Sequence, residues 1–106
     1  LKDDGCDLVI CLSHIGYSYS EKKMCDIDLA KGTSNIDLIL GGHTHTFLEE
    51  PQVFANKDGN SVIVNQVGWA GIMLGQIDFL FDKSSKKKLD DETALLLTKN
   101  CAKKIS

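Results

Sequence analysis

The stretch Ile36-Asp37-Leu38-Ile39-Leu40-Gly41-Gly42-His43-Thr44-His45-Thr46 decides how the rest of the sequence is interpreted. Its first part is a short apolar run that predicts a buried strand, and two histidines one residue apart follow that run. Two glycines precede the histidines, and glycine lets other atoms approach the backbone closely. The stretch therefore predicts a strand whose carboxyl end carries a dense group of metal-binding imidazoles.

A second apolar run repeats this arrangement near the start of the chain. Asp7 to Leu12 is rich in β-branched residues and predicts a strand buried on both faces, with Ser13-His14 directly after it. Between the two runs, apolar residues at helical spacing predict a helix over 20–31, with Ser20 as its N-cap and Gly32 as its stop. A strand, a helix and a strand within about 35 residues indicate a right-handed crossover between parallel strands.

All three histidines of the sequence, His14, His43 and His45, follow one of these two predicted strands. The carboxyl ends of parallel strands meet at one edge of a sheet, and ligands bind beyond that edge. A histidine taken singly is more often a surface or hydrogen-bonded residue than a ligand. The shared placement of all three nevertheless predicts a metal site, because neutral imidazole binds zinc, manganese and iron.

The sequence after Pro51 has the pattern of antiparallel strands rather than of another crossover. An Asp58-Gly59 turn separates two apolar runs and predicts a β-hairpin. The predicted segments are hairpin strands at 52–55 and 61–67, a long strand at 72–82, a turn at 83–88, and a strand or a helix, with strand preferred, at 92–98. We therefore expect an α/β fold in which a βαβ crossover is followed by antiparallel strands.

The composition is that of one small globular domain. The chain has 106 residues, of which 42% are hydrophobic and 25% charged, which excludes a disordered or fibrous protein. No apolar run reaches the roughly 18 residues that a membrane-spanning helix needs. The sequence therefore predicts no membrane span.

Charge is distributed unevenly along the chain. Residues 1–82 contain five Lys and twelve Asp or Glu, a balance of -7, whereas residues 83–106 contain seven Lys and three acidic residues, a balance of +4. Every one of the twelve basic residues is Lys. Without arginine there is no bidentate fork for phosphate or guanine, so the basic end does not predict a nucleic-acid partner.

Four cysteines, at positions 6, 11, 25 and 101, allow two disulfides by number. Their spacing does not include a Cys-x-x-Cys pair, and Cys11 lies inside an apolar run where a thiol packs as a small hydrophobic group. We therefore expect buried, reduced thiols, which leaves the cellular compartment open.

Two motifs of the sequence resemble those of a known family. Ser13-His14-Ile15-Gly16 and the segment from Gly41 to Leu48 resemble the last two ligand motifs of the binuclear metallophosphatases of the calcineurin-like phosphoesterase superfamily. They are most similar to the branch of 5′-nucleotidases and 2′,3′-cyclic-nucleotide phosphodiesterases. Residues 65–68 and 74–78 are similar to the two closing strands of that family.

The resemblance implies a fold and a domain organisation. The fold would be half of a four-layer α/β/β/α sandwich. Residues 1–90 would be the C-terminal half of the catalytic domain, and residues 91–106 would be an extension of uncertain structure. The missing N-terminal half would be a required partner, because half of a sandwich exposes an apolar face. The residues expected on that face are Val9, Ile10, Ile39 and Phe79.

The resemblance also implies a function. His14 and His43 would bind the second of two divalent ions, His45 would bind the first, and the ions would be zinc, manganese or iron. The substrate would be a phosphate ester, specifically a nucleotide, and this chain would hold no catalytic residue beyond its metal ligands. The resemblance to this family also implies a periplasmic or extracellular location. The alternative is a non-catalytic metal-binding or adaptor domain, because no acidic residue directly follows either predicted strand.

Overall fold

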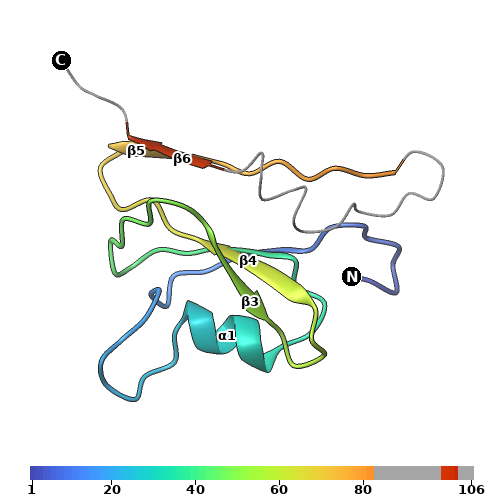
Figure 1. The fold of residues 1–106 in the computed structure, drawn as a ribbon. Coiled ribbons are helices and arrows are strands. Elements are labelled where there is room, and N and C mark those ends of the chain that lie inside the picture. Colours follow the sequence, from blue (N-terminus) through green and yellow to red (C-terminus); the bar gives the residue numbers. More distant parts are fainter. Residues whose placement is uncertain (83–98, 103–106) are drawn as a thin grey trace.

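The computed structural model describes residues 1–82 and 99–102 of the chain. The predicted turn at 83–88 and the predicted strand or helix at 92–98 lie outside these residues. The elements in chain order are β1 (Ile10–Leu12), α1 (Asp26–Gly32), β2 (Leu38–Leu40), β3 (Gln52–Ala55), β4 (Ser61–Asn65), β5 (Met73–Gln76) and β6 (Lys99–Ala102). Figure 1 shows α1 on one side of the main sheet and the β5–β6 pair on the other side.

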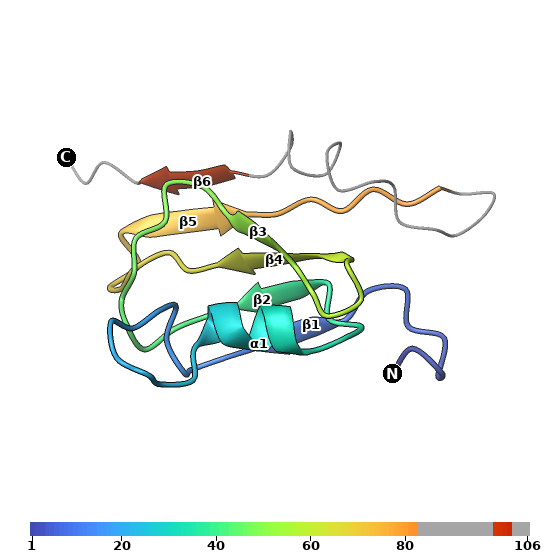
Figure 2. The same cartoon turned by 60° about the horizontal axis from the view of Figure 1, so that its bottom comes forward.

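The main sheet has the strand order β1-β2-β4-β3. β1 and β2 are parallel, β2 and β4 are parallel, and β3 and β4 form an antiparallel hairpin, as Figure 2 shows. In the register Ile10 lies opposite Leu38, and Leu40 lies opposite both Leu12 and Asn65. The predicted α/β fold, with a crossover followed by antiparallel strands, is confirmed.

The hydrophobic core lies between the main sheet and α1. Ala30 of α1 and Ile39, Val62 and Val64 of the sheet form a cluster in which every side chain is fully buried. Val62 and Val64 alternate with Ile63 along β4, so they point to the α1 side of the sheet. This packing holds α1 of the crossover against the sheet.

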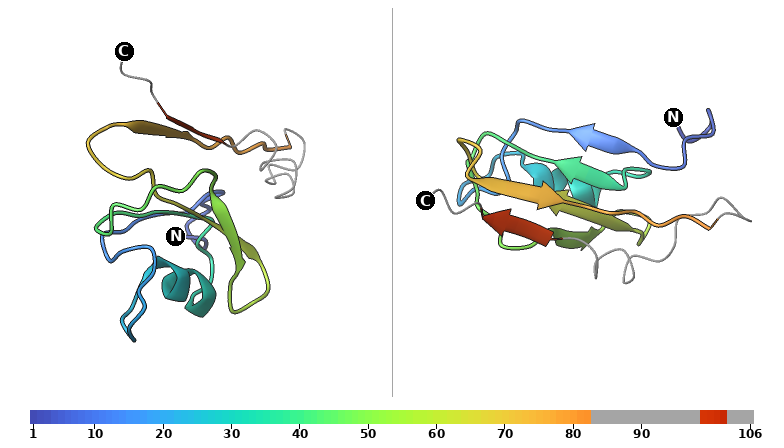
Figure 3. Two further views of the ribbon diagram at one scale, coloured as in Figure 1. Left: turned by 60° about the vertical axis from the view of Figure 1, so that its left-hand side comes forward. Right: turned by 90° about the horizontal axis from the view of Figure 1, so that it is seen from above.

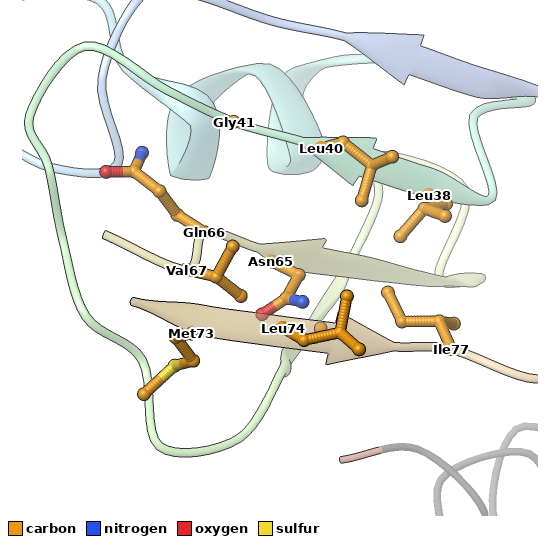
Figure 4. Close-up of a pocket in the computed structure, with 10 residues that line it drawn as sticks. Leu38, Leu40, Gly41, Asn65, Gln66, Val67, Met73, Leu74 and Ile77 are labelled. Carbon is orange, nitrogen blue, oxygen red and sulfur yellow. The ribbon is translucent and has the colours of Figure 1, made fainter. Parts of the chain in front are cut away.

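The opposite face of the main sheet is partly open. Ile10 is 47% exposed and Leu12 is 81% exposed, so the prediction that this strand is buried on both faces is wrong. The prediction that Ile39 would be exposed is also wrong, because Ile39 is fully buried in the cluster with α1. Figure 3 shows the β5–β6 pair beside this open face. An open groove of about 450 Å³ lies there, lined mainly by apolar residues such as Leu40 and Leu74 (Figure 4).

The helix is shorter than the sequence predicts. Ser20 is not its N-cap, because α1 begins after Cys25, whose N–H donates to the Asp28 carboxylate at 3.3 Å. Gly32 is the last residue of α1 and not a stop beyond it. The strands are shorter as well, and β5 ends at Gln76 instead of continuing to residue 82.

The cysteines can be compared with the prediction of buried, reduced thiols. Cys25 is buried as expected, whereas Cys6 and Cys11 are half-buried, and these three residues of the described chain carry free thiols.

Within residues 1–82 and 99–102, no helix has the length and apolar character needed to cross a lipid bilayer.

Candidate metal centre

The segments that follow β1 and β2 lie side by side at the carboxyl edge of the main sheet. The Ser13 N–H donates to the Leu40 carbonyl at 2.9 Å, so the pairing of the two strands continues into these loops. The rings of His14 and His43 consequently meet edge to face, with their centroids 5.2 Å apart and their planes at 71°. The structure thus brings together two of the three predicted site residues.

This spacing fits two imidazoles that share one metal ion. When each nitrogen lies about 2.1 Å from a tetrahedral ion, the two ring centres are roughly 5 Å apart. His14 and His43 are both exposed, so an ion can reach them. In the part of the chain that the structure describes, however, no three His, Cys, Asp or Glu residues are grouped closely enough to hold an ion. An ion bound between His14 and His43 would therefore have to draw further ligands from beyond the described residues.

His45 lies apart from this pair. Its ring stacks on the indole of Trp69, with centroids 5.8 Å apart and planes at 14°. Trp69 is 57% exposed, so one side of this stack faces solvent. His45 is exposed, like the other two histidines, but its ring contact is with Trp69.

The two glycines before His43 allow two different close approaches. A Cβ atom at Gly42 would come within 3.0 Å of the His14 ring nitrogen Nδ1. A Cβ atom at Gly41 would overlap the Asp26 carboxylate and would lie 3.2 Å from the Gln66 amide nitrogen. A side chain at Gly41 is thus incompatible with the position of Asp26, and one at Gly42 would displace the His14 ring slightly.

Asp26 is a fully buried carboxylic acid beside the site. The Ser13 hydroxyl donates to its Oδ1 atom, whereas Oδ2 has no hydrogen-bond partner among the described residues. Burial raises the pKa of Asp26 because it disfavours the charged form, and the hydrogen bond from Ser13 opposes this shift. Burial also raises the pKa of Tyr17, and negative charge on Cys25 acts in the same direction.

The sequence interpretation did not identify Asp26 or Gln66 as residues of this region. Asp26 lies among several other charged residues in the predicted helix over 20–31. Nothing in that pattern distinguishes the buried Asp26 from its exposed neighbours. Gln66 follows β4, and the segment 65–68 resembles a closing strand of the metallophosphatases without marking Gln66 itself. Both residues are buried polar residues, with 0% and 2% exposure respectively, and both lie against Gly41.

Known proteins of one family are similar to this chain. The trifunctional nucleotide phosphoesterase YfkN of Bacillus subtilis is 33% identical over 96 residues, which are 91% of this chain and 6% of that protein. The crystal structure of a 5′-nucleotidase precursor from Thermus thermophilus matches with a TM-score of 0.62 and 25% identity, over 84% of this chain and 18% of that one. The chain belongs to the 5′-nucleotidase family of metallophosphatases.

A further member of the 5′-nucleotidase family, a snake venom 5′-nucleotidase of Crotalus adamanteus, is 27% identical over 109 aligned positions. These positions cover 91% of this chain and 18% of the venom protein. The chain therefore spans far less than two thirds of the length of these relatives. No family model matches the chain. The resemblance in sequence is confirmed, while the ligand roles of the three histidines stay predictions.

Proposed function

We propose that this chain is part of a metal-dependent phosphoester hydrolase and supplies three histidine ligands to a site for two divalent ions. The observation that carries the proposal is the contact of His14 with His43 at the spacing of imidazoles that share one ion. His45 follows on the same loop as His43 and would bind the other ion. The names of the relatives support a nucleotide as the substrate.

The residues of this chain would act as ligands and as their support. When bound, the two ions supply a hydroxide nucleophile and neutralise charge on the phosphoryl oxygens. His14 and His43 would hold one ion through neutral imidazole nitrogens, and His45 would hold the other. Imidazole accepts zinc, manganese and iron alike, so the histidines leave the identity of the ions open.

The proposal assigns residues 1–90 to the C-terminal half of a catalytic domain and residues 91–106 to an extension. An N-terminal half would supply the carboxylate ligands that a two-metal site needs. Two observations support this division. The His14–His43 pair has no third ligand in the described residues, and the chain spans 6% of the length of the Bacillus subtilis relative and 18% of that of the Crotalus adamanteus relative. A periplasmic or extracellular location is part of the same proposal, supported by the venom relative.

Hydrolysis of a chromogenic phosphate ester with added Mn²⁺ or Zn²⁺ tests this proposal. The chain alone is expected to show little or no turnover, and the chain joined to an N-terminal half from a relative is expected to be active. Full activity of the chain alone would contradict the division into halves. Metal binding without activity in the joined protein would favour the alternative, a non-catalytic metal-binding or adaptor domain.

Metal titration tests the ligand assignment independently of activity. If His14 and His43 share one ion, His14→Ala and His43→Ala each remove the same binding event, and the double variant binds no less than either single variant. His45→Ala is expected to affect a different binding event. Additive losses from His14→Ala and His43→Ala would rule out a shared ion.

A further inference from the structure

The side-chain amide of Gln66 contacts the histidine loop at three points. Its Nε2 atom donates to the Gly42 carbonyl at 2.9 Å. Its Oε1 atom accepts from the Thr46 N–H and from the Thr44 hydroxyl, the latter at 3.1 Å. In Figure 4 the Gln66 side chain points away from the apolar residues of the groove, such as Leu74. Gln66 thus bonds to the backbone just before His43, at Gly42, and just after His45, at Thr46.

The Thr44 hydroxyl extends this network to the other histidine loop. Besides donating to Gln66, it accepts a hydrogen bond from the Tyr17 N–H at 3.0 Å. Tyr17 lies three residues after His14, on the segment that follows β1. One buried amide and one hydroxyl therefore join the loop that carries His14 to the loop that carries His43 and His45.

The loop that Gln66 holds has an unfavourable backbone conformation. His43 has a φ of 76° and His45 a φ of 52°, so both lie in the left-handed region that residues other than glycine rarely adopt. Such conformations persist when surrounding contacts determine them. Residues 66–68 supply further contacts, because the Gly68 N–H donates to the Thr46 carbonyl at 2.8 Å and Phe47 pairs with Val67.

We propose that Gln66 is a positioning residue of the histidine site. Its amide holds His43 and His45 in their left-handed conformation and, through Thr44, fixes them relative to His14. The role in metal binding rests on the proposed function, whereas the role in holding the loop does not. Gln66 itself binds no ion, since both ends of its amide are engaged by the loop.

Trp69 provides a readout of loop position that needs no metal. It is the one tryptophan of the sequence, and its ring stacks on His45. The emission of the metal-free full chain therefore reports whether the stack is intact. His45→Ala gives the reference spectrum for an unstacked Trp69.

The experiment compares Gln66→Met, which keeps the volume but removes all three hydrogen bonds, with the matched control Gln52→Met. Gln52 lies in β3, and its amide donates to the Glu50 carbonyl at the surface, at 3.0 Å. In Gln66→Met the Trp69 emission is expected to shift towards that of His45→Ala, and Zn²⁺ affinity is expected to fall about 10- to 100-fold. Gln52→Met is expected to change neither.

The urea midpoint of each variant separates positioning from unfolding. If Gln66→Met does not fold, Thr44→Val replaces it, because valine keeps the shape of threonine and removes the hydroxyl that joins the two loops. Wild-type emission and wild-type Zn²⁺ affinity in the folded variant would overturn the proposal. If Zn²⁺ binds neither to the wild-type chain nor to that chain joined to an N-terminal half from a relative, the proposed function fails. The Trp69 emission alone then decides whether Gln66 positions the loop.

Discussion

Gly41 is a single residue at which the site and the core meet. Its backbone lies against the buried carboxylate of Asp26, so a methyl group there has no room. We expect Gly41→Ala to lower the free energy of unfolding by about 1–3 kcal/mol, the usual cost of overpacking. Urea unfolding measures this, with Gly32→Ala as the control, because a Cβ atom at Gly32 meets nothing within 4 Å.

The same contact predicts a coupling between Gly41 and Asp26. In an Asp26→Ala background the carboxylate is absent, so adding Gly41→Ala is expected to cost less than it does in the wild type. Equal costs in both backgrounds would show that the loss at Gly41 has another origin.

The burial of Asp26 also predicts a dependence of stability on pH. Because burial raises the pKa of Asp26, the unfolded chain loses this proton at a lower pH than the folded chain does. The contribution of Asp26 to stability is therefore highest below about pH 4, the ordinary range of an aspartate, and falls as the pH rises to the raised pKa. Urea unfolding of the wild type and of Asp26→Asn across this range checks the sign. A difference between the two proteins that does not change with pH would contradict it.

Among single residues, the sequence reveals the predicted metal ligands better than the residues that support them. His14, His43 and His45 stand out because they are the three histidines of the chain and all follow strands. Asp26 and Gln66 are chemically ordinary residues whose importance comes from burial, and burial depends on which segments pack together. Sequence spacing alone does not contain that information for a carboxylate in a charged helix.

Among the elements, β4 has the most completely buried side chains of the main sheet. Val64 of β4 is fully buried against α1, whereas Val53 of the paired strand β3, which lies opposite Ile63, is 36% exposed. Val64→Ala is expected to lower the free energy of unfolding by roughly 2 kcal/mol, because it removes two buried methyl groups and leaves a cavity. Val53→Ala is expected to cost less than half of that. Similar midpoints in urea for the two variants would contradict the position of the core.

The crossover and the hairpin could be predicted because they depend on local signals, namely the distance between two apolar runs and an Asp-Gly turn. The boundaries of the helix could not, because Ser20 is a good N-cap by residue type. The observed start instead depends on Asp28 bonding to Cys25 and on the Asp26 N–H donating to the Gly16 carbonyl at 2.8 Å. The contact between Asp26 and Gly16 joins residues ten positions apart. The helix preferences of single residues contain no information about a contact at that separation.

For the molecule as a whole, the two faces of the main sheet differ in how they are covered. α1 covers one face, while the other carries exposed apolar side chains, among them Leu12 at 81% and Ile10 at 47% exposure. An apolar run predicts a strand but contains no information about which segments pack on its two faces. The open face could therefore not be predicted from the residues of β1 alone. Exposed apolar surface of this kind favours association with another surface.

The proposed N-terminal half gives this open face a testable consequence. In the chain alone, Leu12→Ala is expected to change the free energy of unfolding by less than about 0.5 kcal/mol, because Leu12 is exposed there. In a protein that also contains the N-terminal half, we expect a cost of about 2–5 kcal/mol, since the side chain would then be buried. Leu38→Ala is the matched control, because Leu38 is 4% exposed on the same face and is expected to be costly in both proteins. Urea unfolding of both proteins decides the matter, and an equally small effect of Leu12→Ala in each would mean that the N-terminal half does not cover this face.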